Sequence, residues 1–329
     1  MESGPANVTL SSRMTLDDLP TWFVRGIVVV FGLLWGSFLN VVIYRVPREL
    51  SVVSPGSRCP ACEKPIPGWH NLPVLSWLIL RGRAACCGVR VSARYPLVEL
   101  LGGVLSYGIF EVIVRGMPGH PTLGHMALVY GANFALAMGL VAAAFIDVEH
   151  MFLPDAITVG GAILGLATAR LRGMTFADSA IGAVGAFLAI WIPFGLIYKR
   201  LLGRTGMGMG DAKLLALAGA WFGWPGAAVV LFGGAIQGTL YAVVAKITGR
   251  ELGIPDAAKQ DLEELRKAAE EGDEEAKALL AEDPLAEEGA EGRSRIPFGP
   301  FLILAILELM FFGELIWLEV GPLFRFPAS

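Results

Sequence analysis

Long runs of apolar residues, separated by shorter polar stretches, make up most of this chain. A helix that crosses a lipid bilayer needs about 20 apolar residues, because the hydrocarbon core is about 30 Å thick and each residue adds about 1.5 Å. The runs 26–44, 126–146 and 179–198 approach or reach that length without a charged residue, and 296–318 is interrupted only by two glutamates. The pattern predicts helices that span a membrane.

Three further stretches add to this count. The run 214–245 is too long for one crossing, and a Trp-Pro-Gly sequence at 224–226 divides it. Proline and glycine together break a helix, so we expect two spans here, the first of them short. Residues 96–114 and 152–169 are weaker candidates, because the first carries two glutamates and the second follows a Pro-Asp pair. The expected fold is an all-α polytopic membrane protein with about eight transmembrane helices.

The overall composition agrees with a membrane bundle. Of the 329 residues, 54% are hydrophobic and only 17% are charged, which suits a membrane protein better than a soluble one of this length. The formal net charge of −4 argues against a nucleic-acid partner and leaves membrane lipid as the expected surroundings. Residues 1–20 are polar and lack the features of a cleavable signal peptide.

The distribution of Lys and Arg predicts which loops face the cytoplasm, because cytoplasmic loops carry an excess of them. With eight spans, every strongly basic loop falls on one side and both termini fall on the other. We therefore expect cytoplasmic loops at 46–95, 147–154, 199–211 and 247–295. Residues 256–291 differ in charge, with 14 Asp or Glu against 4 Lys or Arg. A solvated helix without chemistry is the simpler interpretation of this segment, and a docking surface for a partner is the alternative.

Two aspartates lie at the predicted cytoplasmic edge of the bilayer on different helices. Asp147 ends the run 126–146, and Asp211 precedes the short span that begins at Ala212. Ionisable groups at that depth are costly, so a functional role is the first hypothesis. The alternative is that each is a helix-end residue that contacts lipid headgroups.

A run of alternating glycines, Gly206-Met207-Gly208-Met209-Gly210, precedes Asp211. Glycines permit unusual backbone angles and let another backbone come close. A peptidase needs this, since the scissile segment must lie as an extended strand beside the acid. Two neighbouring carboxylates cannot both ionise easily, so one keeps a proton while the pair activates a water molecule. Such general acid–base chemistry requires no metal or cofactor.

Other polar residues near these acids allow more than one interpretation. Asp155 is a rival for the first acid, although its place after Pro154 is also that of a helix cap. Lys213 could hold substrate or extend toward lipid headgroups, as lysines at such borders commonly do. Glu149 and His150 could suggest a metal, but we interpret them as loop residues.

Four motifs in order identify a resemblance to the type IV prepilin peptidases, which are GxGD membrane aspartic peptidases. They are Gly36-Ser37-Phe38-Leu39-Asn40-Val41-Val42-Ile43-Tyr44-Arg45, Cys59-Pro60-Ala61-Cys62 with Arg94-Tyr95-Pro96-Leu97-Val98-Glu99-Leu100, the segment Asp147–Asp155, and Gly208-Met209-Gly210-Asp211. The resemblance covers nearly the whole chain except the first twenty residues and 248–295. GxGD alone would be modest support, because presenilin-like proteases share it.

The resemblance implies an enzyme with two activities in the bacterial cytoplasmic (inner) membrane. Its members cleave the leader from type IV prepilins and pseudopilins at the cytoplasmic face, then methylate the new N-terminal residue with S-adenosylmethionine. It implies that Asp147 and Asp211 are the catalytic pair, with Asp155 in a supporting position. Gly208, Gly210 and Lys213 are expected to support them. The family serves type IV pili and type II secretion.

The cysteines depart from the pattern of that family. Its members usually carry two CxxC pairs, and four thiolates from such pairs make a tetrahedral zinc site. Here Cys59, Cys62 and Cys87 match, whereas Ala84 stands at the expected first cysteine of the second pair and Cys86 is displaced beside Cys87. We expect a structural zinc site in which Cys86 substitutes, with free thiols as the alternative. Structural disulfides are not expected in a cytoplasmic loop.

The expected divisions of the chain follow from these interpretations. They are a non-cytoplasmic tail (1–20), the first transmembrane helix (21–46), a cytoplasmic cysteine-containing domain linked to methyl transfer (47–95), a transmembrane peptidase core (96–247), an acidic cytoplasmic insertion (248–295), and the last transmembrane helix with its tail (296–329).

Two other classes of protein compete with a peptidase. A transporter would use the acids to relay protons or bind a cation at broken helices, and it predicts acids nearer the bilayer midplane and an internal repeat. The sequence has neither feature. An inactive scaffold for pilus or secretion assembly would predict the loss of one acid or of GxGD, yet both are present.

Overall fold

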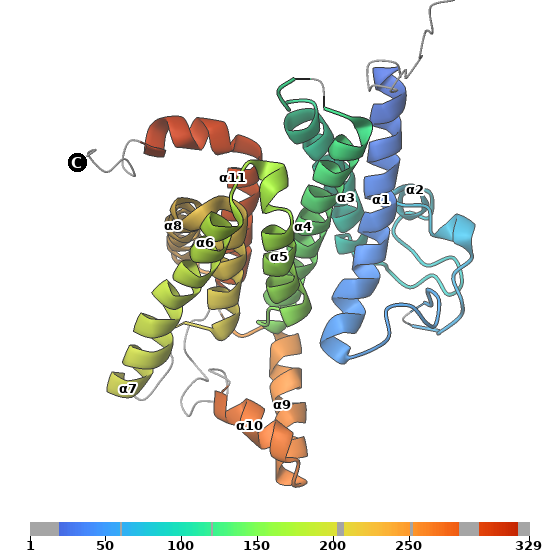
Figure 1. Cartoon of the computed structure of the whole chain (residues 1–329). Coiled ribbons are helices and arrows are strands. Elements are labelled where there is room, and N and C mark those ends of the chain that lie inside the picture. The colour runs from blue at the N-terminus through green and yellow to red at the C-terminus, as the bar shows by residue number, and fades with distance from the viewer. Residues whose placement is uncertain are drawn as a thin grey trace, which may run out of the picture.

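The protein is a helical bundle with two small appendages (Figure 1). The structure, a computed structural model, describes residues 20–59, 61–119, 121–202, 207–250, 253–282 and 296–321. The tails at 1–19 and 322–329, Pro60, Gly206 and positions 283–295 of the acidic insertion lie outside the described residues. The helices are α1 (Thr21–Arg45), α2 (Leu75–Ile79), α3 (Arg94–Gly108), α4 (Leu123–His150), α5 (Asp155–Ala167), α6 (Phe176–Ile190), α7 (Tyr198–Leu202), α8 (Met209–Ile247), α9 (Asp256–Glu270), α10 (Glu274–Glu282) and α11 (Gly299–Val320).

Among the described residues, six helical stretches are long and apolar enough to cross a membrane. They are Thr21–Arg48, Arg94–Val114, Leu123–His150, Phe176–Leu201, Met209–Ile247 and Gly299–Val320. This confirms the all-α polytopic class. The expected count of about eight includes α5, which has 13 residues, and a division of α8; length and composition support six, so the count of eight stays a prediction.

Helix α8 contains a break where the sequence predicts one. Gly223 has φ 70° and ψ −179°, a conformation that is not helical and is essentially restricted to glycine. Before this break, α8 runs parallel to α5, because Lys213 pairs with Asp155 and Leu217, one turn further, packs against Gly161. The first arm therefore leads away from the end of the bundle at which α5 begins.

After the break, α8 runs antiparallel to α11. A Cβ on Gly226 would lie 3.3 Å from Leu309, whereas a Cβ on Gly238 would lie 3.7 Å from Phe298, at the start of α11. The residue numbers rise along one helix as they fall along the other. The second arm of α8 therefore returns toward the end where α11 begins, and the two arms form a helical hairpin.

Glycines let the helices approach closely. A Cβ on Gly32 of α1 would lie 2.4 Å from the carbonyl oxygen of Gly102 in α3, and a Cβ on Gly182 of α6 would lie 2.4 Å from that of Gly219 in α8. Small residues at helix contacts are typical of membrane bundles, where backbone packing replaces the hydrophobic driving force. On the outer side, Phe232, Ile236 and Leu240 of α8 recur every fourth residue and are exposed, as side chains that face lipid are.

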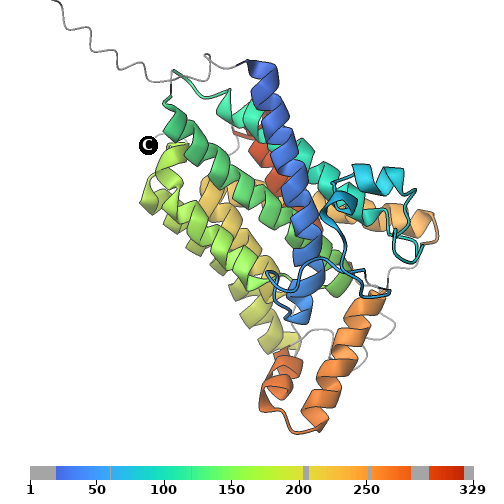
Figure 2. The same cartoon turned by 90° about the vertical axis from the view of Figure 1, so that its right-hand side faces the viewer.

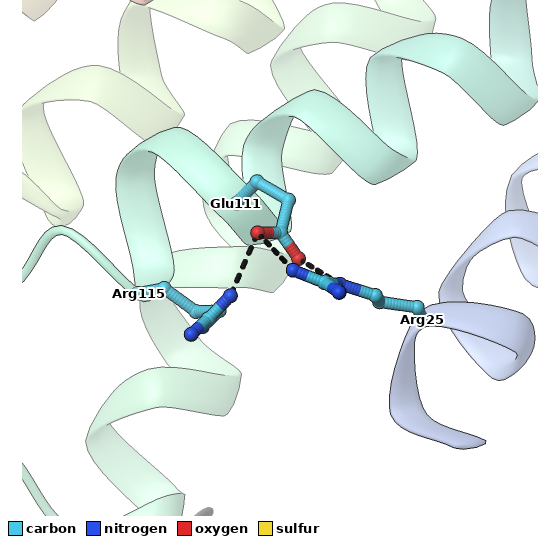
Figure 3. A network of polar contacts seen from close by, with 3 residues as sticks. All are labelled: Arg25, Glu111 and Arg115. Carbon is cyan, nitrogen blue, oxygen red and sulfur yellow. Dashed lines mark hydrogen bonds and ion pairs between the residues drawn. The ribbon is translucent and has the colours of Figure 1, made fainter. Parts of the chain in front are cut away.

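Ion pairs and hydrogen bonds join the helices at the end of the bundle where α1 begins. Glu111, in the π-helical extension of α3 (Ile109–Val114), accepts hydrogen bonds from Arg25 of α1 at 2.7 and 2.9 Å and from Arg115 at 2.8 Å (Figure 3). In the connection between α5 and α6, Arg172 stacks on the Trp221 ring at 4.2 Å and donates to the carbonyl oxygen of Ala220. These contacts fix the first arm of α8 just before the break at Gly223.

The two appendages leave the opposite end of the bundle. The segment 46–93, which contains α2, lies beside α1, while α9 and α10 form a helical hairpin that projects past the end of α4 (Figures 1 and 2). The solvated helix expected for the acidic segment is therefore two helices. Both appendages connect to the end of the bundle that carries the candidate acids.

Candidate functional site

Asp147 lies in the last turn of α4 and is buried, with 6% of its surface exposed. Its burial follows from the long apolar helix that it ends, because Ile146 and Ala143 beside it belong to the core. One carboxylate oxygen, Oδ2, has no hydrogen-bond partner among the described residues. A buried acceptor that is left free in this way is unusual for a structural residue.

Asp211 lies in the first turn of α8, directly after the glycine run. Gly208 is the N-cap residue of α8, in an extended conformation, and a Cβ on it would lie 3.5 Å from Oδ2 of Asp211. That distance is an ordinary van der Waals contact, so the supporting role expected of Gly208 stays a prediction.

The two acids meet around one leucine. Leu153, in the short connection between α4 and α5, is buried; a Cβ on Gly210 would lie 3.1 Å from it, and a Cβ on Gly299 would lie 3.2 Å from it. That same Cβ on Gly299 would lie only 2.5 Å from Oδ2 of Asp147. The carboxyl groups of Asp147 and Asp211 are close enough to interact electrostatically. The structure thus brings together two acids that are 64 positions apart.

Gly299 belongs to this site, although the sequence analysis did not single it out. It is the first residue of α11, and its backbone N–H donates to Asp147. The signal in the sequence was its place between Phe298 and Pro300, where a glycine starts a helix in which alanine would be a better helix former.

Asp155 and Lys213 form an ion pair beside the two acids. The Lys213 ammonium contacts both oxygens of Asp155, at 2.7 and 2.8 Å. Asp155 opens α5 and is largely exposed, whereas Lys213 is half-buried. This arrangement joins α5 to α8, and it gives Asp155 a cationic partner, which neither Asp147 nor Asp211 has among the described residues.

The residues after Asp147 connect α4 to both neighbours. Glu149 forms an ion pair with Arg94, the first residue of α3. His150 is buried, and its Nδ1 lies 2.6 Å from Oδ2 of Asp261 in α9. Both residues belong to the last turn of α4 and not to a loop, as the sequence analysis had interpreted them, and both make contacts between helices.

Four sulfur atoms gather in the 46–93 segment. Those of Cys59, Cys62, Cys86 and Cys87 all lie within 4.8 Å of one another. The Cys59–Cys87 distance is 3.6 Å and the Cys62–Cys86 distance is 3.3 Å. Sulfurs bound to one tetrahedral zinc at about 2.3 Å stand about 3.8 Å apart. The donor set therefore fits zinc, although Cys86 and Cys87 are adjacent.

Two similar turns carry these cysteines. In the first turn, a bridge joins Arg58 to Pro65, the N–H of Cys59 donates to Lys64, and the N–H of Glu63 donates to Cys59. The second turn repeats all three contacts: a bridge joins Arg83 to Arg90, the N–H of Ala84 donates to Val89, and the N–H of Gly88 donates to Ala84. Ala84 thus occupies in the second turn the place of Cys59 in the first, and Cys86 supplies the fourth sulfur from a new position.

The charge state of the thiols also suits a bound cation. The backbone N–H groups of Ala61 and Cys62 lower the pKa of Cys59 to about 6, so its thiolate forms readily. The neighbouring thiols of Cys62 and Cys59 raise the pKa of Cys86 to about 12. Four thiolates would repel one another, and a divalent cation among them removes that obstacle.

Comparison with known proteins came from family models and from curated relatives. The model of the bacterial peptidase A24 N-terminal domain matches residues 30–112, and that of the type IV leader peptidase family matches residues 134–243. No solved structure matches the chain.

Several curated relatives carry the name prepilin leader peptidase/N-methyltransferase. One from Myxococcus xanthus (strain DK1622) is 36% identical over 334 residues, covering 93% of this chain and 96% of the relative. One from Burkholderia pseudomallei (strain 1026b) is 32% identical and covers 92% and 90%. One from Neisseria gonorrhoeae is 36% identical over 256 residues, covering 68% of this chain and 83% of the relative.

Proposed function

Because the chain belongs to the prepilin leader peptidase/N-methyltransferase family, we propose that it cleaves the leader peptide from type IV prepilins and pseudopilins as a membrane aspartic endopeptidase. After cleavage, the same chain methylates the new N-terminal residue. The observation that carries the peptidase is the pairing of Asp147 and Asp211 around Leu153, against which Gly210 and Gly299 pack closely.

The two acids perform the cleavage together. A neighbouring pair of carboxyl groups holds one proton between them. The ionised member takes a proton from a water molecule, which attacks the scissile carbonyl carbon, while the protonated member donates to the carbonyl oxygen. The peptide C–N bond then breaks, and the departing nitrogen takes a proton to leave as an amine. The free Oδ2 of Asp147 suits a group that awaits a water molecule.

Two groups support this pair. The Gly208 and Gly210 backbone borders Asp211 and lets the substrate lie extended beside it. The Asp155–Lys213 ion pair fixes the start of α5 against α8, so the loop that carries Leu153 keeps its position. Asp155 therefore supports the pair from outside, which agrees with its exposure.

The active end faces the cytoplasm in this proposal, and the chain lies in the bacterial inner membrane. The support is the positive charge at that end of the bundle: Arg48, Arg58 and Arg81 belong to the connection between α1 and α3, and Lys199 belongs to α7. An excess of Lys and Arg marks the cytoplasmic side.

The cysteine domain serves the second activity. We infer that the four cysteines hold a structural zinc ion that fixes the two turns of the 47–95 domain, since four sulfurs within 4.8 Å match its preferred ligands. S-adenosylmethionine, when bound, supplies the methyl group. Proteolysis itself needs neither.

Mass spectrometry of a co-expressed prepilin tests the proposal. The wild-type chain should yield a shortened pilin with one added methyl group, whereas Asp147→Asn and Asp211→Asn should each reduce cleavage by about 100- to 10,000-fold, as expected for loss of a general acid–base group. Asp178→Asn is the matched control, because Asp178 also lies in the first turn of a helix, at the far end of the bundle. Full cleavage by either Asp147→Asn or Asp211→Asn would exclude the pair.

A further inference from the structure

Two of the four motifs take no part in the aspartate pair, yet they pack directly against each other. One is the segment 36–45 of α1, and the other is the segment 94–100 at the start of α3. A Cβ on Gly36 would lie 2.6 Å from Cα of Glu99, so the two backbones touch. This contact brings Ser37 beside Glu99 and Asn40 beside Tyr95, which lies four residues before Glu99 on the same helix.

Glu99 is a buried carboxylate without a cation. It exposes 8% of its surface, and its described hydrogen-bond donors are neutral: the N–H of Val74 at 2.7 Å from Oε2, and the hydroxyl of Ser37. No Lys, Arg or His of the described residues forms an ion pair with it. A buried charge is costly unless an opposite charge accompanies it. A positive group bound beside Glu99 would therefore stabilise its ionised form.

Asn40 adds an unused acceptor to the same contact between α1 and α3, one helical turn from Glu99 along α3. Its Nδ2 donates to the carbonyl oxygens of Gly36 at 3.4 Å and Tyr95 at 3.1 Å, which fixes the orientation of the amide. The opposite atom, Oδ1, is buried and has no partner among the described residues, in a residue that is 4% exposed. Buried acceptors are normally satisfied. Among the described residues, Glu99 therefore lacks a cationic partner and Asn40 Oδ1 lacks a donor.

The site also joins the cysteine domain to the peptidase. Val74, which donates to Glu99, precedes α2 of the cysteine domain and has φ 62° and ψ −47°. A β-branched residue with positive φ is strained, and such strain gathers at functional sites. On the other side, Arg94 at the start of α3 pairs with Glu149, two residues after Asp147. A reactant held at Glu99 would lie between the two halves of the enzyme.

We propose that Glu99 and Asn40 form a binding site for an organic cation of the methyl-transfer reaction. The inference rests on the proposed N-methyltransferase function. That reaction has two cationic participants: the sulfonium of the methyl donor and the ammonium group at the N-terminus of the cleaved pilin. Both present polarised C–H or N–H donors with a positive charge, which is what a carboxylate beside an amide oxygen binds.

Binding measurements on the purified full-length chain separate the two sources. In the first arm, S-adenosylmethionine is compared with S-adenosylhomocysteine, which lacks only the methyl group and its positive charge. In the second arm, a peptide with a free N-terminal ammonium is compared with the same peptide acetylated. We expect wild type to prefer one cation over its neutral counterpart by about tenfold, and Glu99→Gln to lose that preference while its affinity for the neutral counterpart stays the same.

Two variants keep the test decisive. Glu111→Gln removes a carboxylate that is already paired with Arg25 and Arg115 and should leave the preference intact. Asn40→Leu keeps the volume, removes the free acceptor and should reduce the preference by about threefold. Prepilin cleavage by each variant reports that it is folded. An unchanged preference in Glu99→Gln, or no preference by a wild-type chain that cleaves prepilin, overturns the site, whereas a wild-type chain that cleaves without methylating contradicts the function on which it rests.

Discussion

Single residues set the geometry of the aspartate pair, and glycines do so as much as the acids. Asp147 is held in place from three elements: its own helix, the connection that carries Leu153, and the start of α11 at Gly299. At Gly299 any side chain would enter the space of the carboxylate, because a Cβ there lies 2.5 Å from Oδ2. The shape of the site therefore depends on a residue that has no functional group.

Gly299→Ala should lower the rate of leader cleavage by about tenfold or more. The added methyl group must displace the Asp147 carboxyl group, and such overpacking costs about 1–3 kcal/mol. The measurement is the initial rate of cleavage of a purified prepilin in detergent. Gly185→Ala is the matched control, since no atom lies within 4 Å of the position of its new Cβ. Equal rates for Gly299→Ala and wild type would contradict the contact between Gly299 and Asp147.

The cysteine turns lead to a second prediction at this scale. Cys86→Ala should lose most of the proposed zinc, measured as metal per protein, because three sulfurs remain of the four within 4.8 Å and a structural zinc site takes four ligands. Methylation should fall with the zinc content while cleavage stays near the wild-type rate.

Adding Ala84→Cys to that variant should restore the zinc, because Ala84 occupies in its turn the place of Cys59 in the first turn. Ala84→Ser is the control substitution that cannot restore it. Full zinc in Cys86→Ala alone would show that Cys86 is not a ligand.

The sequence predicted the acids and the three matching cysteines, because each is a chemical group at a recognisable spacing. It did not predict Gly299 or the pairing of Glu149 with Arg94. These depend on which helices meet in space, and the apolar pattern of a helix does not name its neighbour. The glycines of the GxGD motif were recognised only because an acid follows them.

At the scale of elements, the break in α8 and the short α5 give the bundle its form. A Trp-Pro-Gly sequence predicted the break, and the structure has it one residue earlier, at Gly223. The reversal brings Asp211 and the second arm of α8 to the same end, where α11 also begins. The sequence did not foretell that the acidic segment forms a hairpin in contact with α4, because a charged helix that is amphipathic gives no sign of where it docks.

The hairpin of α9 and α10 is expected to assist catalysis through its contact with α4. His150 lies one turn after Asp147, and its ring is held by Asp261 at 2.6 Å; its Nε2 is buried without a partner in the described part of the chain. Asp261→Ala leaves the buried ring without its remaining partner, at a cost of about 1–3 kcal/mol. Cleavage should fall by several-fold, and amide exchange in 256–270 should become faster.

Asp256→Ala tests whether this effect belongs to the contact. Asp256 lies in the first turn of the same helix, and its side chain is almost fully exposed, so its removal takes away an equal charge from the same segment. It should leave both the cleavage rate and the exchange of α9 near wild type. Similar losses in both variants would assign the effect to the charge of the hairpin and not to the His150 contact.

At the scale of the whole molecule, two family models match two separate regions of the chain, and an ion pair joins these regions in the structure. Residues 30–112 and 134–243 match separately, and the first region holds the cysteine domain and Glu99 while the second holds both acids. The Arg94–Glu149 ion pair connects them near Asp147. In the proposed mechanism, a pilin cleaved at the acids is released beside this contact between the two regions, which is consistent with one chain carrying out the two reactions in succession.

The orientation of the bundle is a property of the whole chain, because it depends on the sum of basic residues in the loops. Lys199 lies in an exposed position near the acids, and Gly124 lies in an exposed position at the far end, where α4 begins. Lys199→Cys and Gly124→Cys therefore report on opposite faces. In intact cells a membrane-impermeant thiol reagent should modify position 124 and not position 199, and after permeabilisation it should modify both, with each site identified by peptide mass spectrometry. The reverse pattern would put the acids outside the cytoplasm and would contradict the proposed cleavage at the cytoplasmic face, because the orientation of the acids and the side of cleavage are one property of the bundle.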